Sequence, residues 1–159
     1  MKAKLMKLLM ELLKDSKRSD REISKVLGVS QPTISRMRQR LTEEGIIQEF
    51  TVIPDFVKMG FQIMAISSFK YKVANDIDGL RKLMMAKPNV IFASLGDGIG
   101  KNGIIISFHR SYPEFSSFIS TLRAEGNDII DDIDSMLIIL ENQIVKPLSL
   151  KYLTELEEK

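Results

Sequence analysis

The side chains best suited to recognise nucleic acid are concentrated between Ser30 and Arg40. Arg can bond guanine O6 and N7, Gln can bond adenine N6 and N7, and Ser or Thr can reach a phosphate or a base edge. Ile34, Met37 and Leu41 recur between these polar residues at helical spacing, so the polar set occupies the opposite face. We expect contact with DNA from one helix and from a lysine just before it: Ser30, Gln31, Thr33, Ser35, Arg36, Arg38, Gln39, Arg40 and Lys25.

These residues are expected to divide the work between bases and phosphates. Gln31, Thr33 and Arg36 lie near the start of the helix, the end that approaches base edges when a recognition helix enters the major groove. Arg38, Arg40 and Lys25 are expected to contact phosphates, which gives affinity without sequence information.

The elements around this helix form a helix-turn-helix pattern. Ser19 and Glu22 have the spacing of a capping box, and the helix they begin has Ile23, Val26 and Leu27 on one face. Gly28 fits the sharp turn because glycine tolerates positive φ. Ser30 can cap the second helix, with Pro32 in its first turn. The alternative is a helical hairpin whose basic face is merely solvated.

The residues that flank this pair complete a small N-terminal domain, residues 1–53. Leucines at i, i+3, i+4 and i+7 predict a first helix over residues 2–14, which packs on the other two. Gly45 is expected to end the recognition helix, and Ile46 to Ile53 is rich in strand-forming residues and predicts a strand, the remnant of a wing. Residues 54–60 are expected to be a linker.

The remainder, residues 61–159, predicts a ferredoxin-like βαββαβ domain with a short helical tail, so the fold class is α+β. Helices in such a domain cover one face of an antiparallel sheet. The last strand carries apolar residues on both faces, and we expect the uncovered face to be buried in a homodimer. The predicted elements are strands at 61–72, 90–95, 103–109 and 133–145, helices capped by Asn75 and Ser111, a helix from Leu148, and a loop at 96–102.

Charge and composition agree with an N-terminal nucleic-acid-binding domain joined to a domain that has another task. Residues 1–50 carry 11 Lys/Arg against 7 Asp/Glu, whereas residues 51–159 carry 12 against 14, which gives +4 and −2. The chain has no cysteine and one histidine, His109, so neither a metal site nor a catalytic triad is expected. Gly98 to Gly103 matches G-x-G-x-x-G but leads into a strand, unlike a dinucleotide site. We expect no cofactor, no enzymatic activity and no membrane span, and a cytoplasmic location.

The stretch RLTEEGIIQEFTVIPDFVKMGF, together with the helix pair before it, resembles the leucine-responsive regulatory protein/AsnC family of prokaryotic transcription regulators. The resemblance implies homodimers, often assembled into octamers, that bind pseudo-palindromic promoter DNA. It also implies a small-molecule effector, commonly an amino acid, bound near the central hairpin of the ferredoxin-like domains. Gly96, Asp97 and Gly98 are the candidate residues there, with Asp97 binding the amine.

Two stretches depart from the family pattern. Gly103 stands about where the family has an aspartate, in a hairpin that is richer in glycine. Residues 127–134 are acidic where the family has a Pro-Gly-Val-like turn, which indicates either recognition of a cationic ligand or a solvated turn. Three functions stay open: an effector-responsive regulator, an architectural DNA-binding protein without an effector, and a small-molecule-binding ferredoxin-like protein with no role at DNA.

Overall fold

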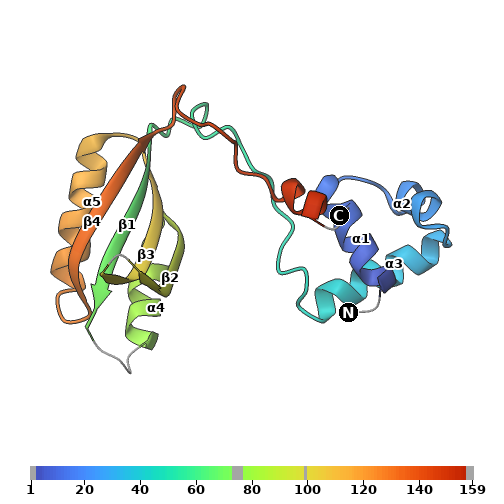
Figure 1. The fold of residues 1–159 in the computed structure, drawn as a ribbon, viewed down its shortest axis with the longest axis horizontal. Helices are drawn as coiled ribbons and strands as arrows, with labels where there is room; N and C mark the ends of the chain where they lie inside the picture. Colours follow the sequence, from blue (N-terminus) through green and yellow to red (C-terminus); the bar gives the residue numbers. More distant parts are fainter. Residues whose placement is uncertain (1–2, 73–76, 99, 157–159) are drawn as a thin grey trace. The chain divides into compact units, whose positions relative to one another are not determined.

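The computed structural model describes residues 3–72, 77–98 and 100–156. The chain divides into two compact units. The first consists of Met1–Ile53 together with Lys146–Lys159, and the second of Pro54–Val145 (Figure 1). No helix among the described residues has both the length and the apolar character needed to cross a membrane.

The first unit is built on three α-helices and a 3-10 helix from the end of the chain. These are α1 (Ala3–Lys14), α2 (Asp20–Leu27), α3 (Gln31–Glu43) and η1 (Leu150–Leu156). Three leucines of the predicted α1 stripe are buried and the fourth, Leu9, is half-buried. The buried core is shared with the two helices that follow: Leu5, Leu8, Leu12, Ile23, Ile34 and Leu41. Val26, expected in the same core, is 55% exposed, because α2 is short and only Ile23 and the half-buried Leu27 face inward.

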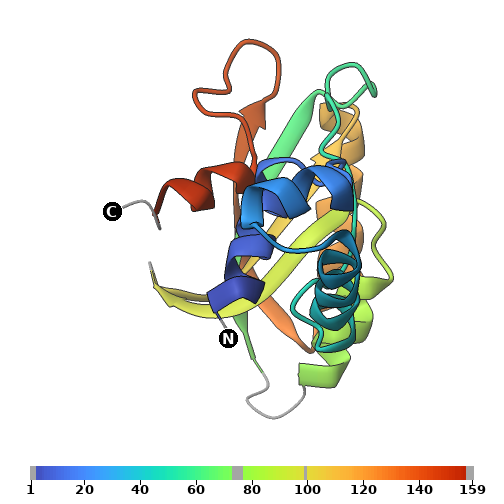
Figure 2. The same cartoon turned by 90° about the vertical axis from the view of Figure 1, so that its right-hand side faces the viewer.

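The C-terminal tail lies with this unit, although the sequence suggested that it belonged to the ferredoxin-like domain. Helix η1 packs beside α1 (Figure 2). Thr154 is buried there, and its hydroxyl donates a hydrogen bond to the carbonyl of Lys151 at 2.7 Å. Residues from the two ends of the chain therefore form one unit.

The predicted strand over residues 46–53 is wrong. Helix α3 ends at Glu43, the chain then turns at Gly45, which has a φ of +68°, and the amides of Ile46 and Ile47 donate to the Leu41 carbonyl at 2.9 and 3.0 Å. Beyond that point the described backbone has no strand pairing up to Ile63. Strand-forming residues need a neighbouring strand to complete their hydrogen bonds, and none lies beside this segment.

The second unit is a four-stranded antiparallel sheet in the order β2-β3-β1-β4, with helices α4 and α5 on one face (Figure 1). The βαββαβ order agrees with the sequence prediction. The bounds are β1 Ile63–Tyr71, α4 Ile77–Met85, β2 Val90–Gly98, β3 Lys101–His109, α5 Tyr112–Glu125 and β4 Ile130–Ile139.

The core of this unit lies between the sheet and the two helices. The predicted stripe of α5 is buried in full, namely Phe115, Phe118, Ile119 and Leu122. Leu80 and Met84 of α4 join it, but Ile77, expected in the same stripe, is half exposed. Ser111 caps α5 by accepting from the Glu114 amide at 3.3 Å. Asn75, the predicted cap of α4, lies outside the described residues.

Several strand boundaries differ from the prediction. The fourth strand begins at Ile130 and ends at Ile139, so the acidic stretch is largely strand and the residues from Leu140 to Val145 are not. The hairpin between β2 and β3 is also tighter than the predicted loop, because Gly98 still pairs with Lys101.

The segment expected to be a linker is held on the second unit by aromatic contacts. Phe56 stacks on Phe108 of β3, with 4.2 Å between ring centroids. The Arg110 guanidinium lies 5.0 Å from the Phe61 ring centroid and donates to the Met59 carbonyl at 3.0 Å. These contacts explain why residues 54–60 belong to this unit.

Candidate nucleic-acid interface

The start of α2 is fixed by the predicted capping box. The Ser19 hydroxyl accepts from the Glu22 amide at 3.3 Å, and the Ser19 amide and hydroxyl donate to the Glu22 carboxylate at 2.8 and 2.7 Å. The hydrogen bond from the Ser19 hydroxyl, and then that from its amide, lowers the pKa of Glu22. The carboxylate is therefore held charged at the positive end of the helix dipole.

The turn between the helices depends on Gly28. Its φ is +62° and its amide donates to the Ser24 carbonyl, while the Val29 amide donates to the same carbonyl at 3.2 Å. A residue with a Cβ is strained in this conformation. Ser30 then occupies the N-cap position of α3, but its side chain makes no capping bond, and its hydroxyl lies 2.8 Å from that of Thr33.

The buried and exposed faces of α3 separate as predicted. Ile34 and Leu41 are fully buried and Met37 is half-buried. Thr33 and Arg38 are half-buried, and the exposed candidates are Ser30, Gln31, Ser35, Arg36, Gln39 and Arg40, with Lys25 exposed on α2. The arrangement offers a polar, basic helix face to a partner.

The exposed arginines differ in what holds them. Arg36 makes one long hydrogen bond, from Nε to the Pro32 carbonyl at 3.4 Å. Arg40 pairs with Glu44 on the same helix, with 2.5 Å between Nε and Oε1, and Gln39 donates to Glu43 at 2.7 Å. Exposed pairs of this kind contribute little to stability, so a phosphate can compete for the arginine.

Arg38 is held in a different way, across two helices. Its guanidinium donates to Asp20 at the start of α2 and to the carbonyl of Arg18. Arg18 in turn pairs with Glu11 of α1. Sequence analysis missed Asp20, Arg18 and Glu11 because their separations along the chain follow no helical spacing.

The candidate effector residues lie at the end of β2. Gly96, Asp97 and Gly98 line a hollow of about 180 Å³, to which Ser68, Lys101, Gly103 and Ile104 also contribute. The acidic stretch reaches the same end of the sheet, since Lys101 pairs with Asp132 and Asp134 at 2.6 and 2.9 Å. The hydrogen bond from Lys101 lowers the pKa of Asp132. These carboxylates therefore neutralise a lysine of the same chain.

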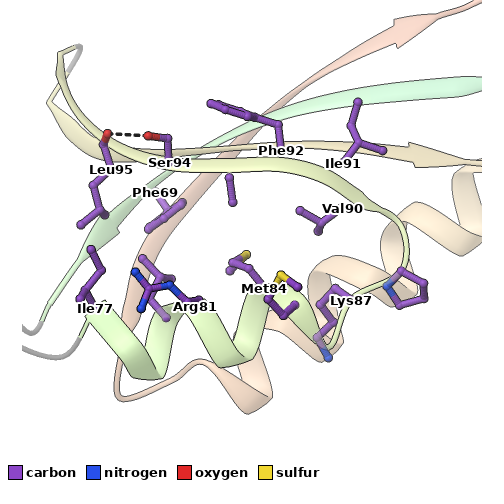
Figure 3. A pocket seen from close by; sticks show the side chains of 14 residues that line it. Phe69, Ile77, Arg81, Met84, Lys87, Val90, Ile91, Phe92, Ser94 and Leu95 are labelled. Atoms are coloured by element: carbon purple, nitrogen blue, oxygen red, sulfur yellow. Dashed lines mark hydrogen bonds between the residues drawn. The ribbon is translucent and has the colours of Figure 1, made fainter. Parts of the chain in front are cut away.

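A larger cleft separates α4 from the edge strand β2 and has a volume of about 490 Å³ (Figure 3). The buried Phe69, Leu80 and Met84 line it, together with the exposed Ile91 and Phe92. Its two cationic side chains already have partners, because Arg81 pairs with Asp78 and Lys87 with Glu125.

Two polar side chains, those of Ser107 and His109, are buried inside the second unit, where a substrate cannot reach them. The Ser107 hydroxyl lies 2.9 Å from Nε2 of His109, and both residues are fully buried. Burial lowers the pKa of His109, so the ring is neutral at pH 7. Nor do the described residues include a group of three or more His, Cys, Asp or Glu side chains that could hold a metal.

Comparison with known proteins agrees with this geometry. Residues 1–48 match a protein family described as winged helix-turn-helix DNA-binding. The uncharacterized HTH-type transcriptional regulator PH0061 of Pyrococcus horikoshii is 32% identical over 102 residues, which cover 64% of this chain and 66% of the relative. The crystal structure of PH0061 gives a TM-score of 0.80 at 25% identity, covering 94% of this chain and 97% of that one.

More distant structures share the whole fold. The Neisseria meningitidis transcriptional regulator NMB0573, solved as a complex with L-Met, has a TM-score of 0.77 at 18% identity and covers 96% of this chain and 99% of its own. E. coli AsnC has a TM-score of 0.74 at 20% identity, with coverages of 93% and 97%.

The fold, the exposed polar face of α3 and the matches to known proteins together define the class of this protein. It is a helix-turn-helix transcriptional regulator, which is a class of DNA-binding protein. The fold is the one seen in leucine-responsive regulatory protein/AsnC regulators such as B. subtilis LrpC and E. coli AsnC, in agreement with the resemblance found in the sequence.

Proposed function

We propose that the protein binds a two-fold symmetric DNA site as a homodimer and reads bases with the first half of α3. The observation that carries the proposal is the separation of faces on this helix. Ile34 and Leu41 are fully buried, whereas Gln31, Ser35 and Arg36 are exposed on a helix with a defined start. Arg40 and Lys25 supply phosphate contacts. Binding should therefore weaken steeply with salt, because each phosphate contact releases counterions.

The uncovered face of the sheet supports the dimer. The register of the strands puts apolar side chains on the face opposite the helices, and several are well exposed, with Phe92 at 52% and Met136 at 67%. A contiguous apolar face of this kind usually marks a protein interface. Its members are Met64, Ile66, Phe92, Ile104, Ile106, Met136 and Ile138. Two recognition helices would then lie about one DNA turn (~34 Å) or a multiple apart.

Selection of bound fragments from sheared genomic DNA at physiological salt tests the proposal. The intact protein should enrich a recurrent two-fold symmetric motif, and an Arg36→Ala/Arg40→Ala variant should lose it. Arg81→Ala removes an exposed arginine from the other unit and should leave the motif unchanged. Enrichment without a motif would favour an architectural protein, and no retention of DNA at all would refute the proposal.

Arg36 and Arg40 have separable roles in this proposal. Arg36→Ala should relax sequence preference at a cost of about 1–3 kcal/mol, because a bidentate base contact is lost. Arg40→Ala should weaken all sequences alike and reduce the salt slope by about one phosphate contact. If Arg36→Ala also weakened all sequences equally, Arg36 would be a phosphate contact instead.

We further propose a small-molecule effector at the end of β2, where Asp97 would bind the amine of an amino acid. The glycines on either side leave room around the carboxylate, and a structural neighbour was solved with L-Met. Titration with L-methionine, followed by the amide NMR signals, should shift Gly96 to Gly98 and change DNA affinity. Shifts confined to the cleft between α4 and β2 would move the site there. No shift for any common amino acid would favour an effector-independent regulator.

Assembly beyond the dimer belongs to the same proposal. Light scattering should give dimers or octamers, and Met136→Lys should dissociate the dimer because it puts a charge in the apolar face. A monomer that still binds DNA as tightly would contradict this assembly. The function requires no catalysis, and a protein that binds a prokaryotic chromosome works in the cytoplasm.

A further inference from the structure

We infer that Arg38 does not contact DNA and is instead the positioning residue that sets the angle between α2 and the recognition helix α3. The inference rests on the proposed function of α3 and refines it. Sequence reasoning placed Arg38 among the phosphate contacts, because it is an arginine within a basic helix.

Two nitrogens of the Arg38 guanidinium, Nε and Nη2, donate hydrogen bonds within the protein. Nε donates to Oδ1 of Asp20 at 3.0 Å, and Nη2 donates to the same oxygen at 2.7 Å. Nη2 also donates to the Arg18 carbonyl at 3.2 Å. The fork of the guanidinium therefore binds one point at the start of α2 from a position on α3, and only a planar side chain with several fixed donors can do this.

The environment of the pair makes these bonds stronger than those of the other arginines on α3. The side chains of Arg38 and Asp20 are 23% and 18% exposed, against 48% and 41% for Arg40 and Glu44. Lower exposure reduces screening by water and salt. Asp20 is also the first residue of α2, where the helix dipole stabilises its negative charge.

The apolar core that α2 shares with α3 is small, so orientation also depends on the polar contacts. Ile23 is the fully buried side chain of α2, and it belongs to the same apolar cluster as Ile34. Such a core holds the helices together but tolerates small rotations. Arg38 bonds Asp20 of α2 and the Arg18 carbonyl, and the Arg18 side chain pairs with Glu11 of α1, so these polar contacts link all three helices and restrict that rotation.

The two roles predict opposite effects of Asp20→Asn on DNA binding. If Arg38 were a phosphate contact, removal of the Asp20 charge would release the guanidinium, and both affinity and salt slope would increase. If Arg38 positions α3, the same change weakens the bond that fixes the helix, and affinity decreases. We expect a decrease of roughly tenfold, the size of one charge-assisted hydrogen bond.

The salt slope provides an independent second readout. Arg38→Met should lower affinity for the selected DNA site by a similar factor and leave the slope of log affinity against log salt unchanged. Arg40→Met should reduce the slope by about one phosphate contact. Asp15→Asn is the matched control for Asp20→Asn, because Asp15 is an exposed residue of the same unit whose carboxylate accepts from the nearby Lys17 amide at 2.9 Å.

The experiment measures DNA binding by the full chain and all four variants over a range of salt concentrations, with circular dichroism to compare folded content. Lower affinity at unchanged slope for Arg38→Met, together with lower affinity for Asp20→Asn, supports the inference. A reduced slope for Arg38→Met or tighter binding by Asp20→Asn would overturn it while leaving the proposed function intact. Failure of the intact chain to bind DNA would overturn the proposed function and, with it, this role for Arg38.

Discussion

Gly103 is the position where we predict that one methyl group will destabilise the second unit most clearly. Gly103 of β3 pairs with Phe69 of β1 in the register of the sheet. A Cβ at Gly103 would lie 2.5 and 2.7 Å from Cε2 and Cε1 of Phe69, and closer still to Cζ. Unstrained carbon atoms approach to about 3.5–4.0 Å, so a shift of about 1 Å is needed. Phe69 is fully buried, so its ring can yield only by displacing packed neighbours or by moving toward the cleft between α4 and β2, which it lines.

The cost of Gly103→Ala follows from this geometry. Overpacking of a core costs about 1–3 kcal/mol, and alanine recovers about 0.4–1 kcal/mol through the smaller entropy of the unfolded chain. We expect a net loss of about 1.3 kcal/mol, the difference of the two midpoints, which lowers the melting temperature of a unit of this size by roughly 5–10 °C. Thermal unfolding followed by circular dichroism measures both quantities.

Gly96→Ala is the matched control for this prediction, since a Cβ at Gly96 meets nothing within 4 Å and its φ is not in the left-handed region. Its stability should stay within about 0.5 kcal/mol of the unchanged protein. In a Phe69→Leu background, where the ring is absent, Gly103→Ala should cost much less than in the unchanged protein. Equal stabilities for Gly103→Ala and Gly96→Ala would refute the steric argument.

Two further predictions concern the first helix cap and the buried histidine. Ser19→Ala removes both hydrogen bonds of the Ser19 hydroxyl, keeps that of the Ser19 amide, and should cost the first unit about 1 kcal/mol in denaturant unfolding, whereas Ser24→Ala, whose hydroxyl donates to the Arg21 carbonyl of its own helix, should be nearly neutral. Burial lowers the pKa of His109 below the 6.5 of the unfolded chain, so stability should decrease as the pH falls below about 6.5 and be insensitive to this group above about 7.5. His109→Gln should remove that part of the pH dependence, and an unchanged profile would contradict the assignment.

Local signals in the sequence predicted the first unit well. The capping box of Ser19, the positive φ of Gly28 and the inward stripe of α3 each depend on residues within about one turn of each other. The alternation of helices and strands in the second unit was predictable for the same reason. These features need no knowledge of distant partners.

The errors concern features decided by distant parts of the chain. Residues 46–53 have strand propensity but no strand to pair with. The tail follows the ferredoxin-like domain in sequence, yet it packs on α1, more than a hundred residues earlier. The partner of Lys101 is the acidic stretch about thirty residues later, which the sequence alone could not distinguish from a solvated turn.

The first unit is assembled from both ends of the chain, so in covalent terms the ferredoxin-like unit is an insertion within it. The ribosome releases residues 146–159 after the ferredoxin-like unit, so the DNA-binding unit is completed only after that unit has been synthesised. The two units are joined by two covalent connections, near residues 53–54 and 145–146. A protease cut at the first connection would leave residues 1–53 held only by packing, because helix η1 lies beside α1 and stays covalently joined to the second unit.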